Sequence, residues 1–115
     1  MTPLIALLLS LSVETLIAAT VVAIDGRCRP SAAAAAAVVG TLLTHRLAWE
    51  EVFVATDHLD WVSAVLLVEA EVVIAEAVVY RAMTVLSTAR SLLVSLLANA
   101  GSTALGFGLW LAGIE

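Results

Sequence analysis

Basic residues are scarce in this chain. It contains no lysine, and its basic residues are five arginines: Arg27, Arg29, Arg46, Arg81 and Arg90. Ten acidic residues bring the formal net charge to −5. Proteins that bind nucleic acid gather basic residues on one face or in one segment. We therefore expect no nucleic-acid partner.

Cysteine and catalytic motifs are also scarce. Cys28 is the single cysteine, so the chain forms no internal disulfide. The sequence holds no nucleophile–base constellation, no glycine-rich phosphate loop and no paired cysteines. These absences predict a protein that is not an enzyme, and no motif indicates a cofactor.

Charged residues of either sign are few. They make up 13% of the 115 residues, hydrophobic residues make up 63%, and the mean hydropathy is +1.11. A soluble domain typically has about 25% charged and about 45–50% apolar residues. The composition is therefore typical of a polytopic membrane protein whose apolar surface contacts the lipid bilayer. The length leaves no room for a second domain, so residues 1–115 are expected to form a single transmembrane domain.

Four segments have the length and apolar character of membrane spans. A helix needs about 20 predominantly apolar residues to cross the hydrocarbon core, and the expected spans are residues 3–24, 31–48, 61–80 and 91–114. Pro3 suits the first turn of a helix, and Ser87 or Thr88 is available as the N-cap of the last. Because the connections are short, neighbouring helices should be antiparallel. The predicted fold class is all-α: an integral membrane four-helix bundle with up-down topology.

The first segment also requires comparison with a signal peptide. It has no basic residues before its apolar run, that run is long, and Glu14 interrupts it. A cleaved signal has a basic start and a short apolar core. We therefore interpret it as a retained helix, with a cleaved signal as the alternative.

Arginine placement predicts the orientation in the membrane. Arg27 and Arg29 lie in the first connection and Arg81 and Arg90 in the third, whereas the middle connection is acidic. Arginine-bearing loops favour the cytoplasmic side. Both termini should therefore lie outside, with a dual or inverted topology as the alternative. The abundant alanine and valine fit a GC-rich genome, and we expect the plasma membrane of a prokaryote.

Aromatic residues support the same orientation. Trp49, Trp61 and Trp110 all fall at the predicted outer ends of their helices. Tryptophan is enriched at membrane–water interfaces, where it forms an aromatic belt. The three side chains are therefore expected at the outer surface of the bilayer.

Four glutamates lie within the predicted spans: Glu14, Glu69, Glu71 and Glu76. No arginine lies at the same depth to pair with them. An ionised side chain at the bilayer centre costs about 3 kcal/mol on insertion scales, and intramembrane ionisable residues commonly mark ion or proton pathways. We therefore predict a site that binds or conducts a cation, or relays protons. The alternative is that each carboxyl is protonated and hydrogen-bonded within the bundle.

Helical spacing separates these glutamates into two faces. Glu69 and Glu76 are seven residues apart and share a face, whereas Glu71 points roughly the opposite way. The predicted cation or proton site therefore consists of Glu14, Glu69, Glu76 and Asn99 in the bundle interior. Glu71 would then face lipid, which predicts that it lies at the contact of a homo-oligomer or a larger membrane complex. The mirror arrangement, with Glu71 inside and Glu69 at the contact, stays open.

A second function is compatible with the same residues. The chain could be a non-catalytic subunit or assembly factor of a larger membrane complex. The glutamates would then bond to partner helices, and stripes of small residues would be the seams where these helices dock.

The middle connection holds a candidate metal site. Its residues are His45, Asp57, His58 and Asp60. Imidazole and carboxylate groups can bind a divalent metal, although this spacing matches no established metal motif. The alternative is a solvated acidic turn.

Overall fold

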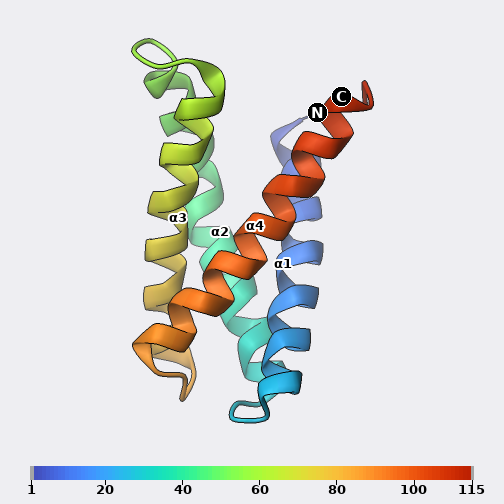
Figure 1. Cartoon of the computed structure of the whole chain (residues 1–115), viewed down its shortest axis with the longest axis vertical. Coiled ribbons are helices and arrows are strands. Elements are labelled where there is room, and N and C mark those ends of the chain that lie inside the picture. The colour runs from blue at the N-terminus through green and yellow to red at the C-terminus, as the bar shows by residue number, and fades with distance from the viewer. Residues whose placement is uncertain (1, 115) are drawn as a thin grey trace.

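The computed structural model describes residues 2–114, which form four helices (Figure 1). Their bounds are α1, Pro3–Asp25; α2, Pro30–Ala55; α3, Trp61–Met83; and α4, Thr88–Leu111. No strand occurs among these described residues. The predicted all-α fold is therefore confirmed.

The ends of α1 follow from local chemistry. The Thr2 hydroxyl accepts a hydrogen bond from the backbone N–H of Ile5 at 3.3 Å, and Pro3 occupies the first turn. Gly26 follows the helix with a φ of 74°, and its N–H donates to the Val22 carbonyl at 2.9 Å. Glycine adopts this left-handed conformation with little steric cost, which ends the helix.

Two further helices begin at side-chain caps. The Asp60 carboxylate accepts from the backbone N–H of Ser63 at 3.1 Å and starts α3. The Ser87 hydroxyl accepts from the backbone N–H of Arg90 at 3.3 Å and starts α4. Ser87 is thus the cap among the two predicted candidates. Such caps satisfy N–H groups that have no partner inside the helix.

The second helix is longer than predicted. It was expected to end at residue 48, but α2 continues to Ala55, and the connector to α3 shrinks to residues 56–60. The added segment begins with two acidic residues, Glu50 and Glu51, yet glutamate is a good helix former. Arg46 Nε also contacts Glu50 Oε1 at 2.9 Å, one turn apart on the exposed helix surface. Polarity alone therefore does not end this helix. The other three helices lie within three residues of the predicted bounds.

The helices alternate in direction around the bundle. Each packs against two neighbours, in the order α1, α2, α3, α4 and back to α1. Both termini and the α2–α3 connector lie at one end, and the other two connectors lie at the opposite end (Figure 1). We call the half with the termini the open half, because α1 and α4 diverge there from α2 and α3. The other half is the closed half.

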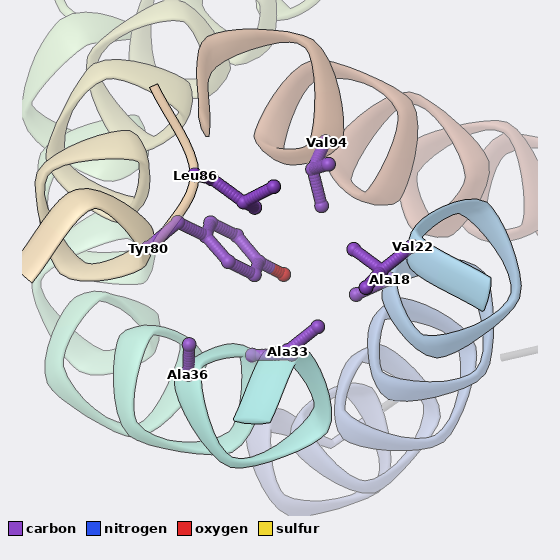
Figure 2. Packing of buried hydrophobic residues seen from close by; sticks show 8 residues of the cluster. Ala18, Val22, Ala33, Ala36, Tyr80, Leu86 and Val94 are labelled. Carbon is purple, nitrogen blue, oxygen red and sulfur yellow. The ribbon is translucent and has the colours of Figure 1, made fainter. Parts of the chain in front are cut away.

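The closed half holds the apolar core. Its fully or almost fully buried side chains are Ala18, Val22, Ala33, Ala36, Ala37, Tyr80, Leu86 and Val94 (Figure 2). Four of these eight residues are alanines, and each alanine has no exposed surface. Small side chains allow helix backbones to approach closely. The helices therefore meet in this half.

The remaining surface is apolar where a soluble protein would be polar. Large hydrophobic side chains such as Leu16, Ile74 and Val78 are more than 60% exposed. The buried polar side chains are Glu14, Thr41, Glu76, Ser91, Ser95 and Asn99. Soluble proteins show the reverse preference. A large exposed apolar surface is of the kind that lipid or another apolar surface covers.

Three helices, α1, α2 and α4, are long and apolar enough to cross a membrane. Among the described residues, α3 does not join this set. Every 18-residue stretch of it includes Glu69, Glu71 and Glu76. Composition therefore supports α1, α2 and α4 as membrane spans. Whether α3 could also cross depends on where its three glutamate side chains lie.

Candidate functional site

Glu14 lies in the centre of the bundle, although it belongs to the most apolar helix. It is 2% exposed. Its Oε2 accepts a hydrogen bond from Thr41 Oγ1 of α2 at 2.7 Å, and the Ser102 side chain of α4 lies beside it. Because Glu14 shares its helix face with buried Ala18, one turn away, the packing that closes α1 onto the bundle also carries the carboxyl inside.

Glu76 of α3 lies in the same region and is also 2% exposed. Its Oε2 accepts from Thr44 Oγ1 at 3.0 Å, and its Oε1 accepts from Asn99 Nδ2 at 3.4 Å. Asn99 is itself held by a 2.9 Å hydrogen bond from Nδ2 to the Ser95 carbonyl. Donors from α2 and α4 therefore fix the Glu76 carboxyl from two sides.

Gly40 makes room for this carboxylate on α2. A Cβ atom at that position would lie 3.1 Å from Glu76 Cγ. That is closer than side-chain carbons normally pack, so the missing side chain lets α2 and α3 approach at the site. Glycine is thus used here for a close helix contact and not for an unusual backbone angle.

Two threonines of α2, one turn apart, each hydrogen-bond one of the two buried carboxyls. Thr41 bonds to Glu14 and Thr44 bonds to Glu76, and the threonines are three residues apart on one helix face. We call Glu14, Thr41, Thr44, Glu76 and Asn99 the core site. Three of the four predicted site residues are therefore brought together.

Sequence reasoning did not identify Thr41 as part of the site. An isolated threonine inside a helix can satisfy its hydroxyl with the carbonyl of the preceding turn, so its presence alone carried no signal. The Thr44 hydroxyl has both the Gly40 carbonyl oxygen and Glu76 Oε2 within 3.0 Å, and it shares its single proton between these two acceptors. The three-residue spacing of the threonines was the available signal.

The fourth predicted site residue, Glu69, lies at the edge of the core site. It is half-buried, and the Thr103 side chain of α4 is its hydrogen-bonding neighbour. Two turns separate Glu69 from Glu76 on the same face of α3. Glu69 thus extends the line of carboxyls toward the open half.

Glu71 lies on the outside of the bundle. It is exposed, and its carboxyl lies beside that of Glu51 on α2. The structure therefore places Glu69 and Glu76 inward and Glu71 outward, in agreement with the helical spacing. The contact of Glu71 with a second copy or another subunit stays a prediction.

Unpartnered hydroxyl groups lie beyond the core site, in the closed half. Tyr80 is 1% exposed, and its hydroxyl has no hydrogen-bond partner within residues 2–114. Figure 2 shows the ring reaching between the helices with its oxygen toward the bundle centre. The Ser91 hydroxyl is likewise buried and, within the same residues, unpartnered. A buried polar group without a hydrogen-bond partner lowers the stability of the fold by about 1–3 kcal/mol. Two such hydroxyls in the closed half are therefore unusual in a folded protein.

The predicted metal ligands are placed in different surroundings. His45 Nε2 lies 2.9 Å from the Pro3 carbonyl oxygen, and Asp60 caps α3. Hydrogen bonds from the Ser63 hydroxyl and backbone N–H lower the pKa of Asp60. Asp57 and His58 lie in the connector. In the part of the chain that the structure describes, no three His, Cys, Asp or Glu side chains gather as a metal site would require.

The core site has the chemistry to hold a proton or a cation. Its carboxyl and hydroxyl oxygens can accept hydrogen bonds or ligate a small cation, and a carboxyl can also bind and release a proton. Within the described residues, the recorded ion pairs are Arg46–Glu50 and Arg90–Asp25, and neither involves the core site. Its two carboxyls therefore have neutral partners.

No protein-family model matches this chain, and comparisons with curated proteins and with solved structures find no match either. The geometry of the core site therefore carries the functional interpretation.

Proposed function

We propose that this is an integral membrane protein in which all four helices span the bilayer. The apolar outer surface and the buried polar side chains support this proposal. The longest dimension of the structure is 41 Å, close to the thickness of a bilayer with its headgroups, about 40–45 Å. In α3, Glu76 is enclosed in the core site and Glu69 faces inward, which leaves Glu71 as the one carboxyl of this helix on the outer surface. Extraction from membranes by detergent but not by alkaline carbonate is the expected result.

We further propose that the core site binds a small cation or relays protons across this membrane. The observation that carries the proposal is the pair of buried carboxyls, Glu14 and Glu76, each hydrogen-bonded to its own threonine hydroxyl on α2 and neither paired with a basic residue in the described part of the chain. Glu69 on the open side and the unpartnered Tyr80 hydroxyl on the closed side extend the polar groups along the bundle. Such a line is the arrangement that proton relays use.

The test is ion movement in liposomes that contain the purified protein. A potassium gradient with valinomycin sets the voltage, and a trapped pH dye or sodium dye reports entry. The Glu14→Gln/Glu76→Gln variant keeps the shape of the site but removes both acidic groups, so we expect it to lose the flux. Glu71→Gln is the matched control, because Glu71 lies outside the bundle, and it should keep the flux. Equal flux from the double variant and the wild type would contradict the proposal.

A second candidate function is supported by the outer surface of α2 and α3. Glu71 and Glu51 lie together there, outside the bundle. Carboxyls on a lipid-facing surface are unfavourable, so a protein partner covering them is a reasonable explanation. In this proposal the chain is a non-catalytic subunit of a homo-oligomer or a larger membrane complex. Native mass spectrometry in mild detergent tests it: a wild-type monomer without any partner would oppose it.

A further inference from the structure

The open half contains a cavity of about 370 Å³ between all four helices. Cavities of about 300–1,000 Å³ are typical of small-molecule sites. Its walls include all three tryptophans of the chain. The aromatic residues that line it are Trp49, Phe53, Trp61, Phe107 and Trp110.

The rings form two walls. Trp49 and Phe53 stand on α2, with ring centroids 6.2 Å apart. On the other side, Trp61 of α3 stacks on Trp110 of α4 at 5.7 Å and meets the edge of Phe107 at 5.4 Å. A membrane-surface belt needs rings only around the outside of a protein. These rings also line an open-sided cavity between the helices, which a belt does not require.

Glu69 supplies the negative charge in this cavity. The lining, within residues 2–114, includes this one carboxyl and one histidine, His45, but no arginine and no aspartate. Ser102 and Thr103 of α4 also line the cavity, and Ser102 lies beside Glu14 of the core site. The cavity is therefore apolar and aromatic at its walls and acidic where it approaches the core site.

We propose that this cavity binds a hydrophobic organic cation, a quaternary or protonated amine of small-molecule size. The faces of tryptophan and phenylalanine rings attract cations, and the attraction is worth about 0.5–2 kcal/mol depending on how well water is excluded. Glu69 provides the opposite charge, and the low-dielectric walls strengthen that attraction. An anion of the same shape meets the ring faces and Glu69 with unfavourable electrostatics. This inference rests on the proposed function, because Glu69 is the outward extension of the core site.

The test compares two ions of the same shape and opposite charge. Tetraphenylphosphonium and tetraphenylborate are each measured by equilibrium dialysis against the wild-type protein in detergent, with protein-free micelles subtracted. We expect saturable binding of the phosphonium and quenching of tryptophan fluorescence, since every tryptophan lines the cavity. Equal binding of both ions, or no saturable phosphonium binding, overturns the inference.

Variants locate the binding. Glu69→Gln should weaken phosphonium binding by on the order of tenfold or more, because it removes the charge partner, whereas Glu69→Asp should retain most of it. Trp61→Leu should weaken binding by roughly threefold to thirtyfold through the lost cation–π contact. Glu71→Gln is the matched control on the same helix and should bind as the wild type does. Unchanged binding in folded Glu69→Gln overturns the inference. The wild-type comparison of the two ions decides the question if that variant does not fold.

The two proposals fail separately. Dialysis in detergent requires no transport, so absence of phosphonium binding with normal Glu14- and Glu76-dependent flux overturns only the cavity ligand. Phosphonium binding that depends on Glu69, with flux unchanged in the Glu14→Gln/Glu76→Gln variant, overturns only the function of the core site.

Discussion

The two halves of the bundle differ in how side chains fill the space between the helices. In the closed half, Ala18, Ala33 and Ala36 have no exposed surface, and the helices meet. In the open half, tryptophan and phenylalanine side chains line an open-sided cavity between diverging helices. Small residues therefore close one end, while large rings line the other without filling it. The core site therefore lies between a packed region and an open one.

The largest expected effect comes from placing the same substitution in each half of α2. Ala33→Leu adds three carbons to a fully buried position, and overpacking of this kind costs roughly 1–3 kcal/mol. Ala48→Leu adds them to the wall of the cavity, where space exists, so its free energy of unfolding should change little. Thermal unfolding by circular dichroism in one detergent measures both variants. If Ala33→Leu and Ala48→Leu lowered the melting temperature equally, the proposed difference in packing between the closed and open halves would be wrong.

In the closed half, removing a hydrogen-bonded hydroxyl should lower the free energy of unfolding more than removing a hydroxyl without a partner. Ser95 Oγ donates to the Val73 carbonyl at 2.7 Å, whereas Ser91, one turn earlier on α4, has no partner within the described residues. Ser95→Ala should lower the free energy of unfolding by about 1 kcal/mol, while Ser91→Ala and Tyr80→Phe should leave it unchanged or raise it. The same melting experiment reports this. A loss on Tyr80→Phe as large as on Ser95→Ala would show that the Tyr80 hydroxyl has a partner, such as water.

The smallest expected effect belongs to the N-cap of α3 in the open half. The lowered pKa of Asp60 means that its ionised form is favoured by folding. Its contribution to stability is therefore full above the pKa of an unfolded aspartate and is lost as the pH falls through the lowered value. Asp60→Asn keeps a capping side chain but should remove this part of the pH dependence. Melting temperatures of both proteins across acidic pH measure it, and parallel curves would contradict the assignment.

Much of the fold could be predicted from local sequence. Long apolar stretches and short connections indicate four antiparallel helices, and Ser87 and Thr88 before the last stretch are both possible caps for it. The extent of α2 could not be read this way, because Trp49, Glu50 and Glu51 look like a membrane boundary but are also compatible with a helix. Polarity indicates where a span leaves the bilayer, and this helix continues beyond that point.

The candidate site was predicted only in part. Glu14, Glu69, Glu76 and Asn99 stand out because charge and amide groups are unusual in apolar helices. Thr41 does not stand out, since a threonine can bond within its own helix. The cavity was also not predicted, because the tryptophans at the helix ends are equally expected in an interfacial belt.

The sequence by itself determined that this chain forms apolar helices carrying carboxyls in their middle, since composition and periodicity are local properties. Only the tertiary structure decided which groups those carboxyls meet. Thr41 and Glu14 are 27 residues apart, and Thr44 and Glu76 are 32 residues apart. Such contacts depend on how the helices cross, and the crossing depends on where alanine and glycine allow two backbones to approach.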